Sequence, residues 1–185
     1  MPGRIFWDVD TQADFMEPDG KLYVPGAAEI APALKLLVDA ARAADAIHVA
    51  SADDHELTDP EISAEPDYTS TYPPHCLRGT RGAEKIAETK QHDPLPLSLV
   101  PYPPAIVPAL VEGRREILLL KKNFDVFTNP NTEALLDALD PDEIVVFVED
   151  AARGLDDERT AACTAFWREG GVEFSTVEEV IASLG

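Results

Sequence analysis

Positive charge is scarce in this chain. The 185 residues contain 15 Lys and Arg against 35 Asp and Glu, which gives a formal net charge of −20. Nucleic acids and anionic membrane surfaces attract proteins through positive charge. We therefore expect neither of them to be a partner of this protein.

Long apolar runs are missing and cysteines are few. No stretch approaches the roughly 18 apolar residues of a membrane span. The opening MPGRIFWDVD lacks the basic start and apolar run of a targeting segment, so we expect a cytoplasmic protein. The two cysteines, Cys76 and Cys163, fit no disulfide framework.

Short apolar segments alternate with amphipathic ones along the sequence. The predicted strands are 4–9, 46–50, 116–120, 143–148 and 172–175. The predicted helices are 27–44, 108–112, 131–139, 156–169 and 177–184. This alternation predicts an α/β fold of three layers, with a mostly parallel sheet of about five strands between helices. The length predicts a single domain over residues 1–185.

Polar residues follow three of the predicted strands. They are Asp10, Asp53, Asp54, His55, Lys121 and Lys122. Because open parallel sheets form their sites at the carboxyl ends of the strands, these residues could supply a base, a cation and metal ligands. Polar residues at strand ends can also do no more than cap loops, and the pattern alone leaves both interpretations open.

A long polar segment, 51–80, follows the second predicted strand and holds a second histidine, His75. It is too long to be a simple connection. Its two imidazoles and neighbouring carboxylates indicate either a metal site or ordinary polar surface. Of the other histidines, His48 lies inside an apolar strand and is predicted to be a satisfied core residue. His92 lies in a charged stretch and is predicted to be solvated.

Several motifs, spread in order over nearly the whole chain, resemble those of one family. They are DTQADFM at 10–16, DDH at 53–55, YPPHCLRGT at 72–80, KKNFDVF at 121–127 and VEDA at 148–151. Together they resemble the isochorismatase-like cysteine hydrolases, and in particular the metal-bearing nicotinamidase branch. The resemblance implies an amidohydrolase that converts the carboxamide of a small heterocyclic amide to acid and ammonia. Since relatives often assemble, it also implies a homo-oligomer.

The resemblance also implies a metal centre. Asp53, His55 and His75 match the metal ligands of the family. One carboxylate and two imidazoles suit Zn²⁺, Fe²⁺ or Mn²⁺ and leave positions open for water or substrate. In some relatives another histidine stands where this chain has Glu61, whose carboxylate could bind the metal or act through water.

Two catalytic residues follow from the same resemblance. Asp10 matches the general base of the family, which moves protons between the nucleophile and the leaving ammonia. Lys121 matches the neighbouring cation. A lysine three residues before Phe124 fits the family spacing, which selects Lys121 over Lys122.

The family's nucleophile is not found. Relatives place a cysteine at a helix start after a strand and a Gly-Val turn, whereas residues 142–154 read DEIVVFVEDAARG. By this comparison one strand-crossover unit of roughly 30 residues is absent, which leaves one strand fewer than the usual six. Neither Cys76, beside a predicted metal ligand, nor Cys163, inside a predicted helix, is expected to replace it. Three possibilities stay open. The chain could be an amidohydrolase that attacks through a thiolate, with water held by the metal as a substitute for the missing cysteine. It could be a metal- and ligand-binding descendant without turnover, or the sequence could reflect an altered gene with a natural or engineered deletion.

Overall fold

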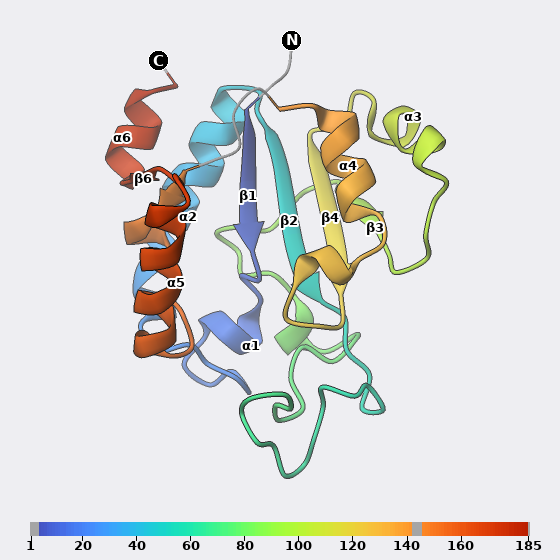
Figure 1. Ribbon diagram of the computed structural model, residues 1–185, viewed down its shortest axis with the longest axis vertical. Helices are drawn as coiled ribbons and strands as arrows, with labels where there is room; N and C mark the ends of the chain where they lie inside the picture. The colour runs from blue at the N-terminus through green and yellow to red at the C-terminus, as the bar shows by residue number, and fades with distance from the viewer. Residues whose placement is uncertain (1–3, 142–145, 185) are drawn as a thin grey trace.

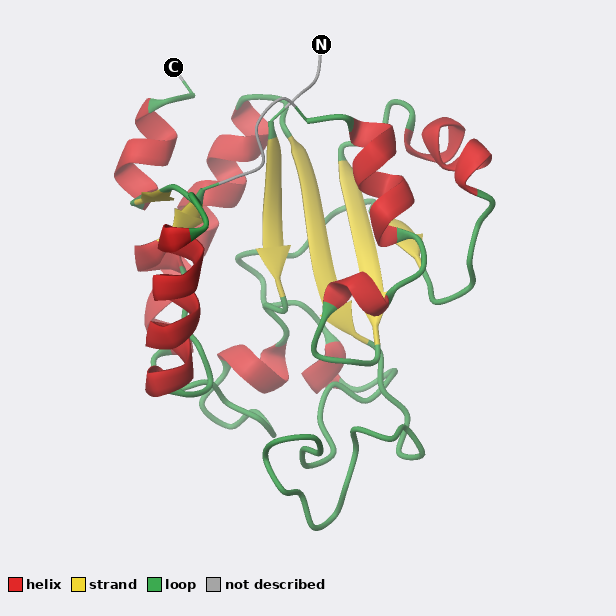
Figure 2. Cartoon of the chain, in the orientation of Figure 1, coloured by secondary structure: helices red, strands yellow, loops and turns green. Residues whose placement is uncertain are grey.

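A computed structural model describes residues 4–141 and 146–184, and its centre is a parallel β-sheet (Figures 1 and 2). The strand order is β1-β2-β4-β3, and every neighbouring pair is parallel. The strands are β1 (Ile5–Val9), β2 (Ile47–Asp53), β4 (Glu116–Lys121) and β3 (Leu95–Leu97). Parallel pairing brings the carboxyl ends of β1, β2 and β4 to one edge of the sheet.

Helices pack on both faces of this sheet. On one side α2 (Ala27–Ala43) buries an apolar stripe that includes Ile30 and Leu34. On the other side α3 (Val107–Val111) and α4 (Thr132–Leu139) pack on Val49 and its neighbours in β4. Figure 1 shows α4 crossing in front of β4. The expected three-layer α/β arrangement is confirmed.

Shorter elements complete the described chain. The helix α1 (Ala13–Met16) follows β1 directly. The C-terminal part holds β5 (Phe147–Val148), α5 (Asp157–Glu169), β6 (Phe174–Ser175) and α6 (Val177–Ala182). Single turns of 3₁₀ helix occur at Arg81–Ala83, Pro104–Ile106, Val126–Thr128 and Glu149–Ala151. No helix in the described ranges is long and apolar enough to cross a membrane.

The parallel sheet was predicted correctly, but its strands differ from the predicted set. The main sheet has four strands, and one of them, β3, is not among the predicted strands. Its Pro96 has no N–H to donate, which confines such a strand to a sheet edge, and β3 is an edge strand. The last two predicted strands pair with each other as β5 and β6, apart from the main sheet. Residues 142–145 of the predicted strand 143–148 lie outside the described residues.

Candidate active site

Asp10 lies where β1 ends. Its φ of 53° turns the chain out of the sheet, an uncommon conformation for a residue with a side chain. The Asp10 carboxylate accepts a hydrogen bond from Ser51 Oγ at 2.7 Å and lies 3.0 Å from Lys121 Nζ. The predicted base and the predicted cation are therefore in direct contact.

Lys121 lies at the end of β4, and its side chain is only 3% exposed. Its Nζ donates to Asp53 Oδ1 at 2.5 Å as well as contacting Asp10. Burial alone would lower the pKa of this lysine, but the negative charges of Asp10 and Asp53 outweigh that effect and raise it. Lys121 is therefore a cation that joins two carboxylates.

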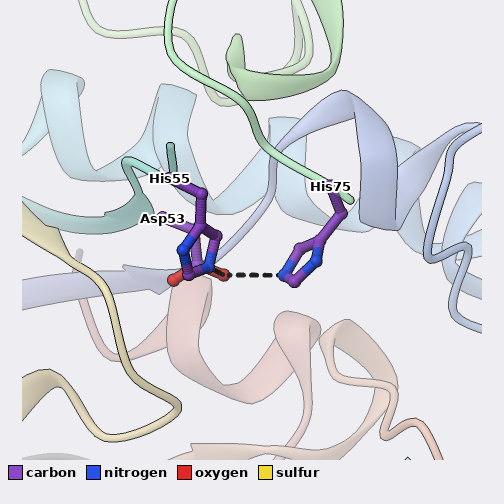
Figure 3. Close-up of side chains that lie close together, drawn as sticks. All are labelled: Asp53, His55 and His75. Atoms are coloured by element: carbon purple, nitrogen blue, oxygen red, sulfur yellow. Dashed lines mark ion pairs between the residues drawn. The ribbon is translucent and has the colours of Figure 1, made fainter. Parts of the chain in front are cut away.

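Asp53, His55 and His75 meet at the same edge (Figure 3). Their ligand atoms all lie within 4.8 Å of one another, and all three residues are buried. Asp53 Oδ2 is 3.7 Å from His55 Nε2 and 3.5 Å from His75 Nε2. The three metal ligands implied by the sequence are thus brought together, from the end of β2 and from the loop that follows it.

The other ring nitrogen of each histidine has its own acceptor. His75 Nδ1 lies 2.7 Å from the carbonyl oxygen of Pro73, so this nitrogen must carry the hydrogen. His55 Nδ1 lies 3.4 Å from Asp59 Oδ2. Acceptors of this kind fix the tautomer of metal-binding histidines and leave the Nε2 lone pair for the metal. His55 Nε2 is buried and has no hydrogen-bond partner among the described residues. Buried polar atoms are normally paired, so this nitrogen is a candidate metal ligand.

The charges around this cluster favour a cation at its centre. Burial alone would raise the pKa of Asp53, but His55, His75 and Lys121 lower it well below its usual range. Burial alone would lower the pKa of His55, yet the neighbouring carboxylate of Asp53 raises it. Asp53 is therefore an ionised, buried carboxylate beside two imidazoles, which is a donor set suited to a divalent transition metal.

Glu61 lies near this cluster but outside it. The set of ligand atoms within 4.8 Å does not include its carboxylate. Burial, followed by the negative charge of Asp53, raises the pKa of Glu61, and its own charge contributes to the raised pKa of His55. The role of Glu61, as a ligand or through a bridging water, stays a prediction.

The two cysteines occupy very different places. Cys76 is fully buried, its Sγ lies 3.7 Å from the Gly82 carbonyl oxygen, and burial strongly raises its pKa. A thiol held neutral in this way is a poor nucleophile. Cys163 is exposed in the middle of α5. Neither cysteine starts a helix in the described structure.

Other polar residues around the site carried no specific sequence signal. Ser51 contacts Asp10, and Asp59 joins His55 to Lys122, whose Nζ lies 2.8 Å from Asp59 Oδ1.

Two further histidine predictions can be compared with the structure. His92 is exposed, as predicted. His48 is buried as predicted but not satisfied, since neither ring nitrogen has a hydrogen-bond partner in the described structure. Its Nε2 lies 3.6 Å from Asp8 Oδ2, too far for a direct hydrogen bond.

Comparison with known proteins defines the class of this chain. The family model of the isochorismatase domain matches residues 8–147, and the chain belongs to this family. It is 45% identical over 78 residues to the nicotinamidase/pyrazinamidase of Mycobacterium tuberculosis (strain ATCC 25618 / H37Rv). That match spans 41% of this chain and 40% of the relative, so the chain covers about two fifths of that protein's length. The resemblance to the nicotinamidase-like branch is confirmed.

Solved structures show the same fold. The pyrazinamidase of Pyrococcus horikoshii, in complex with zinc, has a TM-score of 0.67 at 19% identity and aligns over 93% of this chain and 98% of its own. An isochorismatase family protein from Desulfovibrio vulgaris subsp. vulgaris str. Hildenborough has a TM-score of 0.71 at 18% identity, over 97% of each chain. At these identities the comparison establishes the architecture, while the chemistry must be argued from the site.

Proposed function

We propose that this chain is a nicotinamidase-like amidohydrolase, which binds a divalent metal and hydrolyses the carboxamide of a small heterocyclic amide to acid and ammonia. One observation carries the proposal: buried Lys121 joins Asp10 to Asp53, the carboxylate of the histidine cluster. The Asp10 side chain is 24% exposed, whereas that of Asp53 is 7% exposed. A carboxylate within reach of a small molecule therefore lies beside a buried cation and a metal-ligand set.

Asp53, His55 and His75 are the residues that would hold the metal. The orphaned Nε2 of His55 and the ionised Asp53 support this assignment, as does the zinc in the P. horikoshii neighbour. A metal bound here would orient the substrate and polarise the groups that it contacts. Zn²⁺, Fe²⁺ and Mn²⁺ all suit one carboxylate and two imidazoles.

Asp10 is the proposed general base. It would take a proton from the attacking nucleophile and deliver it to the nitrogen that leaves as ammonia. Ser51 and Lys121 hold its carboxylate from two sides, so that it needs little rearrangement to act. Lys121 would also offset the negative charge that develops on the carbonyl oxygen during attack.

Water is the proposed nucleophile. Cys76 is buried as a neutral thiol, and Cys163 lies on an exposed helix, so the described structure offers no suitably activated thiolate. Attack by water forms one C–O bond and breaks the C–N bond, giving a carboxylic acid and ammonia. Every atom of the reaction then comes from water and the amide.

A second candidate is metal and ligand binding without turnover. The same placement of the two cysteines favours it, since relatives of this class are expected to attack through a cysteine. The two candidates share the metal site and differ only in catalysis.

The test is ammonia release from nicotinamide and related carboxamides by the metal-loaded chain. We expect turnover that survives in Cys76→Ala and Cys163→Ala and falls by about 100-fold or more in Asp10→Asn, in line with the usual size of general-base effects. Loss of turnover in one cysteine variant would instead identify a relocated thiol nucleophile. Stoichiometric metal binding without any ammonia release would establish the second candidate.

A further inference from the structure

We propose that Gln12 and Asp14, in the turn that follows β1, are positioning residues that set the metal ligands Asp53 and His75. The inference rests on the metal site proposed above. Both residues act through the backbone of other residues, and neither belongs to the ligand cluster itself. They link the segment that carries the base to the segments that carry the metal ligands.

The Gln12 side chain forms hydrogen bonds with both the N–H and the C=O of Asp53. Its Oε1 accepts a hydrogen bond from the Asp53 backbone N–H at 2.6 Å, and its Nε2 donates to the Asp53 carbonyl oxygen at 2.8 Å. The same Nε2 donates to the carbonyl oxygen of Ala83 at 2.9 Å. Gln12 is fully buried, so its amide has exchanged water for these three contacts.

The Gln12 side chain provides hydrogen bonds that β1 would otherwise make to β2. The regular pairing of β1 with β2 ends at Val9 and Ser51, because the chain turns away at Asp10. The buried backbone groups of Asp53 would otherwise lack partners on that side, at a considerable cost in free energy. The Gln12 amide presents an acceptor oxygen and a donor N–H along one edge, so it can bond both the N–H and the C=O of Asp53 and supplies the partners that β1 no longer provides at the metal ligand.

Asp14 holds the segment that carries His75. The side chain of Asp14 is buried. Its Oδ2 accepts a hydrogen bond from the backbone N–H of Cys76 at 2.6 Å, and its Oδ1 accepts one from the backbone N–H of Lys21 at 3.0 Å. Cys76 directly follows His75 and has a φ of 44°, a strained conformation that needs such support. Gly82 allows the close approach, since a Cβ there would lie 2.1 Å from Asp14 Oδ2.

These contacts leave the ligands little freedom. The ring orientations of His55 and His75 are set by acceptors at Nδ1, whereas the backbone positions of Asp53 and His75 depend on Gln12 and Asp14. Loss of a residue that holds a metal ligand in place typically weakens metal binding by about 10- to 100-fold. The turn after β1 should therefore control metal affinity as well as carry the base.

The first variant is Gln12→Glu, which keeps the shape of the side chain but replaces the donating NH₂ by an oxygen. Gln91→Glu is the matched control, because Gln91 is also buried and its Nε2 also donates to a β2 carbonyl, that of His48, and to that of Ile117 in β4. His48 lies toward the opposite end of β2 from Asp53. We expect both variants to lose stability, but only Gln12→Glu to bind Zn²⁺ at least about tenfold more weakly.

The readout is Zn²⁺ affinity by chelator competition, together with the visible absorption spectrum of the Co²⁺-loaded chain. Asp14→Asn gives an independent arm if Gln12→Glu does not fold, with Asp67→Asn as its control. The exposed Asp67 also accepts backbone N–H groups, from Thr69, Ser70 and Thr71. We expect Asp14→Asn to weaken Zn²⁺ binding and to alter the Co²⁺ spectrum, and Asp67→Asn to leave both unchanged.

Wild-type affinity in a folded Gln12→Glu or Asp14→Asn variant would overturn the inference, as would an equal loss in the matched control. A wild-type chain that binds no zinc would contradict the metal site and this inference together. Because the readout is metal binding, an inactive chain that shows the expected pattern would support the inference while contradicting the proposed hydrolysis.

Discussion

At the scale of single residues, Lys121 is the central charge of the site. Its ammonium group is buried between the carboxylates of Asp10 and Asp53. Removing one partner of a buried ion pair leaves an uncompensated charge, which costs far more than losing an exposed pair. The lysine thus stabilises the fold as well as serving the proposed chemistry.

Lys121→Met should therefore lower the free energy of unfolding of the metal-free chain by roughly 3–5 kcal/mol. Urea denaturation measures the change. Lys35→Met is the control, because Lys35 pairs with Asp39 on the surface of α2 and its side chain is 58% exposed, and such pairs contribute at most about 1 kcal/mol. Similar losses in both variants would contradict the buried-charge account.

A second buried pair gives a pH prediction. Asp8 lies 2.9 Å from Lys85 Nζ, and both side chains are at least nine-tenths buried. Burial alone would raise the pKa of Asp8, but Lys85, together with the neighbouring His48, outweighs that effect, and the pKa lies below its usual value. The folded pKa is then lower than the unfolded one of about 3.9, so the pair contributes stability above that pH and loses it as the pH falls through the folded pKa.

The free energy of unfolding should accordingly fall more steeply below about pH 4 in the wild type than in an Asp8→Asn, Lys85→Met double variant. Urea denaturation of the metal-free chain at a series of pH values measures both slopes. Equal slopes would show that this pair does not contribute to acid unfolding.

At the scale of elements, the sequence predicted most of the helices and the three long strands, but neither strand β3 nor the separate pairing of β5 with β6. The apolar periodicity of α2 places it within one residue of the predicted 27–44. β3 has only three residues, one of them Pro96, and β5 and β6 have two each. Such short segments contain too few residues for a period to show, and only contacts distant in sequence decide their pairing.

The site follows the same division. Asp10, Asp53, His55 and Lys121 were candidates because parallel strands end at one edge. The family resemblance then assigned their roles and selected His75 as a further ligand. The contact of Ser51 with Asp10 and that of Gln12 with Asp53 each join residues 41 positions apart. No local pattern encodes contacts of that kind. The role predicted for Glu61, as a ligand or through water, stays untested.

The helix α5 should be the least protected of the longer helices. It has 13 residues and buries none of them, whereas α2 buries six. Because helices in proteins are stabilised mainly by packing, the amides of α5 should exchange with solvent faster than those of α2. Hydrogen exchange followed by mass spectrometry measures this at a concentration where the chain is monomeric, since association through α5 would itself protect that helix. Equal protection of both helices there would contradict it.

At the scale of the whole molecule, three exposed apolar side chains lie close together in sequence in the C-terminal part. Phe166 is 73% exposed, and Trp167 and Val172 are each 38% exposed. In Figure 1, α5 and α6 lie on the flank of the sheet beside β1, which is an edge strand. Exposed apolar surface and an open sheet edge both favour association.

We therefore predict a homo-oligomer in solution, despite the net charge of −20. Light scattering after size exclusion should give a mass above that of one chain, and Phe166→Ser should shift it toward the monomer. Phe124→Ser is the control, since Phe124 is 70% exposed but lies after β4 rather than on α5. A monomeric wild type, or the same shift in both variants, would contradict the prediction.

The metal site is the central claim, and the metal content of the zinc-loaded chain after removal of free metal tests it most directly. We predict one equivalent of Zn²⁺ in the wild type and in His92→Ala, whose histidine is exposed and lies outside the cluster. His55→Ala and His75→Ala should each lose the metal. A wild type without bound zinc, or retention of zinc in both ligand variants, would contradict the account.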